Sequence, residues 1–138
     1  DKRLSNYGKI IPIRDVTEGS VVTSLLGEEF INNDVPLIIA NCDQYFDWDI
    51  NHFISNAEGF DASVAVFEST NPHHSYIASE NGKITYVREK EVISNLACGG
   101  FYFYKKGSDY VKFAKELIQN NDRTNGEFYI TPIFNYLC

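Results

Sequence analysis

Apolar residues recur with a helical period in two segments of this chain. The pattern predicts one amphipathic helix over residues 18–31, with Thr17 placed to cap its start. The same period over residues 108–119 predicts a second helix, for which Ser108 is the expected cap. Two shorter helices are predicted at 48–54 and at 127–137.

Strand-like runs separate these helices. The run from Val35 to Ala40 is apolar without alternation, which is typical of a strand covered on both faces. The pair Asn81-Gly82 is a turn signal and predicts a hairpin around it. The hairpin strands are expected at 75–79 and 83–87, and further strands at 9–13, 62–68 and 97–104. The alternation of helices and strands predicts an α/β fold with a mixed sheet.

Composition places these elements in one domain spanning residues 1–138. The chain has 138 residues, of which 43% are hydrophobic, so it has enough apolar material for a packed core. Its net charge of −7 argues against binding along a nucleic-acid backbone, and no apolar run approaches the roughly 20 residues that a membrane span needs. Three cysteines without CxxC spacing predict neither a disulfide framework nor a zinc site, and favour a reducing, cytoplasmic compartment.

Two acidic motifs follow the most apolar strand. Asp43 stands directly after it, where a carboxylate at the carboxyl end of a strand can bind Mg²⁺, although it can equally cap a turn. The triplet Asp47-Trp48-Asp49 spells DxD, which many glycosyltransferases use to bind a metal–nucleotide pair. The alternative interpretation, which the residues favour, is that Asp47 or Asp49 caps the short helix.

Two further pairs suggest a ligand site. Glu89-Lys90 follows the hairpin, and a carboxylate beside an ammonium suits a sugar phosphate, with an exposed ion pair as the alternative. Gly99-Gly100 lies inside an aromatic strand, where glycine indicates a bulge or a close approach of the backbone to a ligand. Cys98 precedes this pair in an apolar setting that predicts a core residue rather than a nucleophile.

Taken in order, these residues resemble the sugar-phosphate nucleotidyltransferases, which make NDP-sugars from an NTP and a sugar 1-phosphate. The resemblance runs nearly end to end. It rests on Thr17-Glu18-Gly19 before a helix, Pro36 to Asp43 (PLIIANCD), Glu89-Lys90, Gly99 to Phe103 (GGFYF), and Asn125-Gly126-Glu127 with Thr131. It implies the Rossmann-like nucleotide-diphospho-sugar transferase fold, with a mostly parallel sheet that is incomplete at the N-terminus.

The resemblance also implies roles for particular residues. Asp43 would bind Mg²⁺, and Asp43 and Lys90 would be the catalytic residues, with Lys90 contacting the sugar phosphate. The implied substrate-binding residues are Thr17, Glu18 and Gly19 near the nucleotide base, Asn41, and Glu89, Gly100 and Glu127 around the sugar. The implied reaction is in-line attack of the sugar-phosphate oxygen on the α-phosphorus of the NTP, with release of pyrophosphate. The implied setting is NDP-sugar supply for surface polysaccharide.

The chain also departs from the family pattern. The glycine-rich loop that cradles the triphosphate is absent, and Pro132 stands where many members carry a second metal-binding aspartate. We therefore expect a central to C-terminal part of such an enzyme that is inactive by itself. Two alternatives are a glycosyltransferase that uses Asp47-Trp48-Asp49 and a non-catalytic binding or regulatory module. The sequence leaves the nucleotide, the sugar and homo-oligomerisation open.

Overall fold

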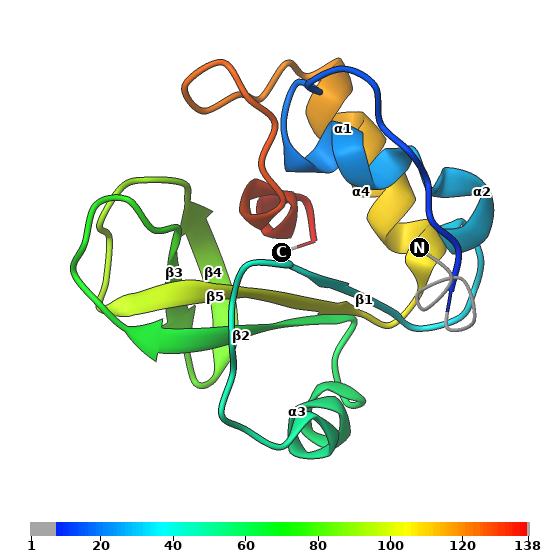
Figure 1. The fold of residues 1–138 in the computed structure, drawn as a ribbon. Coiled ribbons are helices and arrows are strands. Elements are labelled where there is room, and N and C mark those ends of the chain that lie inside the picture. The colour runs from blue at the N-terminus through cyan, green and yellow to red at the C-terminus, as the bar shows by residue number, and fades with distance from the viewer. Residues whose placement is uncertain (1–7, 138) are drawn as a thin grey trace.

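The computed structural model describes residues 8–137 and is built around one long strand, β5 (Leu96–Tyr104) (Figure 1). Three strands pair with β5, and all three run antiparallel to it: β1 (Leu37–Ala40), β2 (Ala62–Glu68) and β3 (Tyr76–Glu80). β4 (Lys83–Arg88) completes the hairpin by pairing antiparallel with β3.

The expectation of a mostly parallel sheet is therefore wrong. β1 and β2 do run in the same direction, but β5 inserts between them in the opposite direction and pairs with both. Tyr104 lies opposite Leu37 on one side and opposite Ala62 on the other. The order of strands along the chain could not reveal this insertion, because β5 follows β1 by more than fifty residues and reaches it through non-local pairing.

The helices lie on two sides of the sheet. α1 (Ser20–Leu25), α4 (Gly107–Gln119) and the 3₁₀ helix η1 (Thr131–Tyr136) lie on one side, and α3 (Ile50–Ala57) on the other (Figure 1). The core fills the space between β5 and the first group, where Val21, Tyr104, Tyr110, Leu117 and Ile133 are fully buried. No helix within residues 8–137 is long and apolar enough to cross a membrane.

Several predicted elements differ from the observed ones. The helix expected over 18–31 is divided into α1 and α2 (Glu28–Ile31), because the chain is interrupted around Gly27. The C-terminal helix expected at 127–137 is the shorter 3₁₀ helix η1, which has Pro132 in its first turn. Residues 9–13 form no strand; Lys9 instead lies over the Phe30 ring of α2, 4.0 Å from its centroid.

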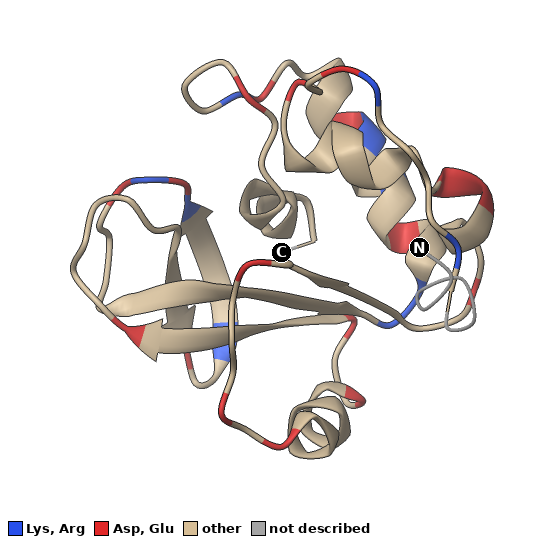
Figure 2. Ribbon diagram, viewed as in Figure 1, with Lys and Arg blue, Asp and Glu red and all other residues tan. Residues whose placement is uncertain are grey.

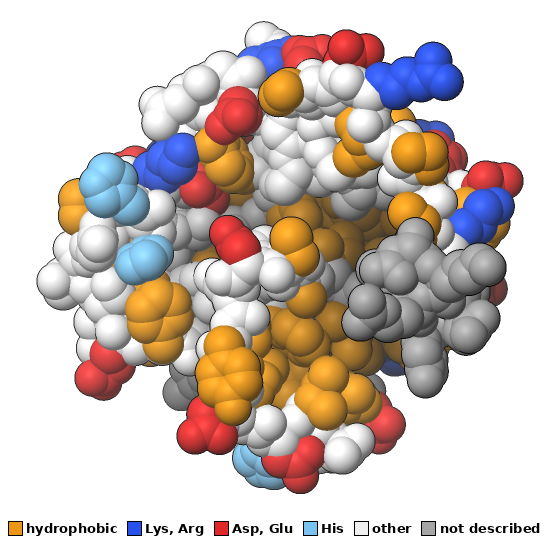
Figure 3. All heavy atoms as spheres, in the orientation of Figure 1, with side chains coloured by type: hydrophobic (Ala, Val, Ile, Leu, Met, Phe, Trp, Pro, Cys, Tyr) orange, Lys and Arg blue, Asp and Glu red, His pale blue; other side chains and the backbone are white. Residues whose placement is uncertain are grey.

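The predicted caps and the cover of β1 also need correction. The N-cap residues of α1 and α4 are Gly19 and Lys106, and neither helix has a side-chain cap. The Thr17 and Ser108 hydroxyls donate to Gly19 O and to Asp34 instead. β1 alternates between half-buried and exposed residues, so the expectation of cover on both faces is wrong. Figure 3 shows apolar side chains gathered between β1 and α3, the elements that carry the exposed Ile38 and Ile50.

Candidate functional site

A polar pocket of about 280 Å³ opens where the end of β1, the loop after β4, and residues 129–131 meet on β5. The residues expected at a ligand site that line this pocket are Asn41, Glu89, Lys90 and Gly100. They come from three separate stretches of the sequence, and the antiparallel insertion of β5 brings them together. Figure 2 shows acidic and basic residues scattered over the fold. In this pocket one acidic residue, Glu89, lies next to one basic residue, Lys90.

Glu89 is the partly buried carboxylate of the pocket. The hydroxyl of Ser75, which precedes β3, donates a short hydrogen bond to Glu89 Oε2. Burial raises the pKa of Glu89, while the Ser75 hydrogen bond and the neighbouring Lys90 act in the opposite direction. One carboxylate oxygen is thus held by the protein, and the other can accept from a ligand hydroxyl.

Lys90 takes part in a hydrogen-bonded chain that the sequence did not reveal. Its Nζ donates to Tyr129 Oη at 2.6 Å, and Tyr129 Oη donates to Glu127 Oε2. The hydrogen bond that Lys90 donates to Tyr129 raises the pKa of Lys90, so the ammonium is charged at neutral pH. Glu127, which the resemblance places near the sugar, is not among the residues that line the pocket and is joined to Lys90 through Tyr129. The only signal for Tyr129 in the sequence is its place two residues after Glu127.

The Gly100 backbone shapes the opposite wall. Gly100 has φ +71, and a Cβ on it would lie 2.5 Å from Gln44 Oε1 and closer still to Asn41 Nδ2. The Asn41 N–H donates to Gly100 O at 2.9 Å, which ties the end of β1 to β5. The absence of a side chain here lets the two amide side chains lie directly over the strand.

Buried groups form the floor of the pocket. The hydroxyls of Tyr102 and Thr131 share a hydrogen bond of 2.9 Å and are both buried. Burial raises the pKa of the Cys98 thiol to about 12, so this cysteine is neutral at ordinary pH. The expectation that Cys98 is a core residue agrees with its burial.

Thr17, Glu18 and Gly19 lie outside the lining of this pocket, although the next residue, Ser20, is part of it. Glu18 forms an ion pair with Arg123. Gly19 has φ +120 and faces the Phe128 backbone, where two hydrogen bonds join the segments: Phe128 N–H to Glu18 O at 2.8 Å and Val21 N–H to Phe128 O at 3.1 Å. The glycine is therefore required by packing.

The two acidic motifs do not form a metal centre by themselves. Asp43 is exposed on a bend beside the pocket, between the lining residues Asn41 and Gln44. Asp49 caps α3 by accepting from the Asn51 N–H at 2.9 Å, as one of the two interpretations of the DxD triplet predicted. Within residues 8–137, no group of three or more His, Cys, Asp or Glu side chains could hold a metal ion.

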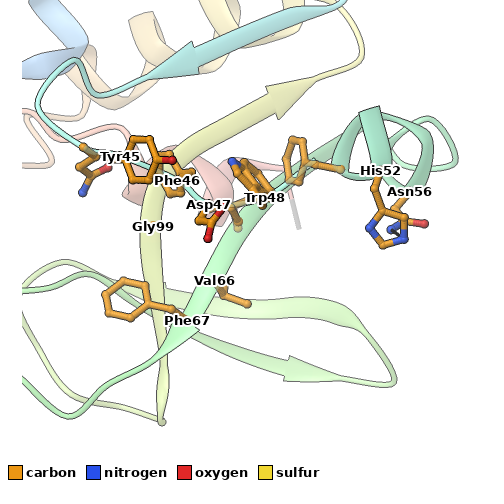
Figure 4. Close-up of a pocket in the computed structure, with 13 residues that line it drawn as sticks. Tyr45, Phe46, Asp47, Trp48, His52, Asn56, Val66, Phe67 and Gly99 are labelled. Atoms are coloured by element: carbon orange, nitrogen blue, oxygen red, sulfur yellow. Dashed lines mark hydrogen bonds between the residues drawn. The ribbon is translucent and has the colours of Figure 1, made fainter. Parts of the chain in front are cut away.

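A second cavity, of about 680 Å³, lies between the loop before α3, α3 itself and β2 (Figure 4). Asp47 lines it together with Phe46, Trp48 and Phe67, and Gly99 forms part of its wall. The Trp48 ring contacts the rings of Phe46 and Phe53, and all three rings contact Phe101, with centroids 5.1–5.9 Å apart. Within residues 8–137 no lysine or arginine lines this aromatic cavity, so the described lining offers no cation to a phosphate.

The fold is shared with solved structures of sugar nucleotidyltransferases. One is the nucleoside-diphosphate-sugar pyrophosphorylase from Vibrio cholerae RC9, with a TM-score of 0.72 and 23% identity over 91% of this chain and 55% of that one. Another, from Bacillus anthracis, is described as a glucose-1-phosphate thymidylyltransferase in complex with a sucrose. It has a TM-score of 0.71 and 26% identity over 91% of this chain and 50% of that one. The chain thus spans about half the length of these structures. No protein-family model matches it, and no curated protein gives a significant match.

Proposed function

We propose that the polar pocket binds a sugar 1-phosphate and is the sugar-phosphate side of a nucleotidyltransferase site. The observation that carries the proposal is the pairing of Glu89, a partly buried carboxylate, with the ammonium of Lys90 at the mouth of a pocket of about 280 Å³. The free Glu89 oxygen would accept from sugar hydroxyls, and Lys90 would pair with the phosphate. The likeness in fold to two nucleotide-sugar enzymes supports this class of reaction.

The proposed reaction, carried out by a longer enzyme of which this chain would be a part, transfers a nucleotidyl group from an NTP to the sugar phosphate. A phosphate oxygen of the sugar 1-phosphate attacks the α-phosphorus, the bond from that phosphorus to the bridging oxygen breaks, and pyrophosphate leaves. Lys90 would hold the attacking phosphate in place, and Glu89 would fix the orientation of the sugar, so the chain contributes positioning rather than acid–base groups. The wider proposal includes a cytoplasmic location and supply of an NDP-sugar.

Magnesium belongs to the same proposal. The Asp43 carboxylate is exposed and has no hydrogen-bond or ion-pair partner among the described residues. A single unpaired carboxylate is compatible with Mg²⁺, which is commonly coordinated by one or two carboxylates together with substrate phosphates. When bound there, the ion would neutralise phosphate charge beside a chain of net charge −7.

Calorimetric titration of the 138-residue chain with a panel of sugar 1-phosphates tests the proposal. We expect saturable binding that Lys90→Ala weakens at least about tenfold, because it removes a charge-assisted phosphate contact. Glu89→Gln should change which sugars bind. Lys83→Ala is the matched control, since it removes an equal charge from the hairpin, outside the pocket lining. Absence of binding for the whole panel, or equal loss in Lys83→Ala, would refute the assignment.

A second assay separates binding from turnover. The sequence has no glycine-rich loop to hold a triphosphate, so we expect the chain to bind sugar phosphate without releasing pyrophosphate from any NTP. Pyrophosphate release by this chain would contradict that expectation. Binding of neither sugar phosphate nor Mg²⁺–nucleotide would favour the alternative of a non-catalytic module.

A further inference from the structure

We propose that Tyr129 is a positioning residue for Lys90: its hydroxyl anchors the ammonium at the mouth of the pocket and is itself anchored by Glu127. The inference rests on the proposed function in so far as Lys90 binds phosphate. The anchor is visible as a chain of two hydrogen bonds, from Lys90 Nζ to Tyr129 Oη at 2.6 Å and from Tyr129 Oη to Glu127.

The backbone of Lys90 supports the same arrangement independently. Lys90 has φ +56, a left-handed conformation that is uncommon for lysine, and its N–H donates to His74 O at 3.1 Å. The main chain therefore turns sharply after Glu89 and directs the lysine toward residues 127–129. The ammonium also lies 4.5 Å from the centroid of the Tyr129 ring, so both the ring and the hydroxyl hold it.

The count of donors and acceptors shows what the anchor does. An ammonium has three N–H donors, of which Tyr129 takes one, so two remain for phosphate oxygens. The phenol oxygen accepts from Lys90 and uses its only hydrogen on Glu127, so its orientation is fixed. The carboxylates that also act on the Lys90 ammonium are Glu89 on its own segment and Glu127 beyond Tyr129. Without the hydroxyl, Lys90 would be free to swing away or to pair directly with a carboxylate.

The perturbation that isolates this role is Tyr129→Phe, which keeps the ring and removes the hydroxyl. Calorimetry with α-glucose 1-phosphate and the other sugar 1-phosphates should show about three- to tenfold weaker binding, the cost of ordering one long side chain on binding. Tyr45→Phe is the matched control, because Tyr45 is 90% exposed and outside the pocket. Unchanged affinity in Tyr129→Phe would overturn the inference.

A double-mutant cycle distinguishes positioning from direct contact. If Tyr129 acts through Lys90, then Tyr129→Phe should have no further effect once Lys90→Ala is present. Additive losses would mean that Tyr129 contacts the ligand or supports the fold by itself, and would overturn the inference.

A ligand-free measurement keeps the inference separate from the proposed function. Ultraviolet titration of the tyrosines, compared with Tyr129→Phe, gives the pKa of Tyr129, which the Glu127 hydrogen bond raises and Lys90 lowers. Lys90→Ala should therefore raise this pKa further, and Glu127→Gln should lower it. If no sugar phosphate binds but both shifts occur, the proposed function fails and the anchor stands. If neither variant moves the pKa, the anchor is refuted whatever the calorimetry shows.

Discussion

Gly19→Ala tests the contact that fixes residues 127–129 beside the pocket. Gly19 has φ 120 and ψ 177, a backbone region that is essentially restricted to glycine. An added Cβ would lie 2.6 Å from Phe128 N and closer still to Phe128 O. Neither atom can move away freely, because Phe128 N–H and O both bond to the segment around Gly19, through Glu18 O and the Val21 N–H.

The magnitude follows from two separate costs. Forcing alanine into this backbone region costs about 1–3 kcal/mol. Relief of the clash requires at least one of the two backbone hydrogen bonds to lengthen, and each contributes about 0.5–1.5 kcal/mol. We therefore expect Gly19→Ala to lower the free energy of unfolding by about 1.5–4.5 kcal/mol, a large share of the stability of a typical domain.

Two other glycines separate the costs in a urea-unfolding series. Gly126 has φ +85 but open space around it, so Gly126→Ala should show the backbone cost alone, about 1–2 kcal/mol. Gly59 has open space and no positive φ, so Gly59→Ala should be close to neutral. If Gly19→Ala costs no more than Gly126→Ala, the close approach to Phe128 is refuted. Normal stability with selective loss of nucleotide binding would instead support the base-site role that the family resemblance implied.

Three further outcomes can be checked by urea unfolding. Burial raises the pKa of Glu89, so the folded chain keeps the carboxyl proton at pH values where the unfolded chain has released it. The free energy of unfolding should therefore fall as the pH rises from about 4.5 through the folded pKa. Glu89→Gln should not show this fall. Thr131→Val removes the partner of the buried Tyr102 hydroxyl and should cost about 1–3 kcal/mol, largely recovered when Tyr102→Phe is added. Asp49→Ala should cost about 1 kcal/mol as a lost helix cap, whereas Asp47→Ala should be neutral; equal costs would contradict the cap assignment.

The elements that the sequence predicted well are those set by local pattern. β2 was expected at 62–68 and spans those residues, and α4 differs from its expected 108–119 by a single residue at its start. The strand at 9–13 failed because an apolar, β-branched run requires a partner strand, and the described residues provide none beside it. The prediction of a mostly parallel sheet was wrong for a related reason, since the pairing of β1 and β2 with β5 depends on contacts distant in sequence.

In the candidate site, too, the sequence predicted the residues marked by a local pattern and missed the contacts between distant positions. Glu89 and Lys90 were noticed because they are adjacent in sequence, and Gly100 because glycine is unusual in an aromatic strand. The hydrogen bonds from Ser75 to Glu89 and from Lys90 to Tyr129 were not predicted, because they cross 14 and 39 positions and no local pattern marks them. Tyrosine occurs nine times in the chain, so its presence two residues after Glu127 carries little information by itself.

The polar groups of the pocket depend on unusual backbone geometry at three places. Gly100 at φ +71 admits Asn41 and Gln44 over β5, Lys90 at φ +56 directs its side chain to Tyr129, and Gly19 at φ +120 permits the pairing that holds residues 127–129. The first and last of these need the absence of a Cβ, whereas Lys90 adopts the left-handed conformation at an energetic cost. Such a cost is maintained only where surrounding contacts determine the conformation, and here they are the bonds to His74 and Tyr129. The positive φ of Lys90 therefore supports, independently of the family resemblance, the proposal that Lys90 binds the phosphate.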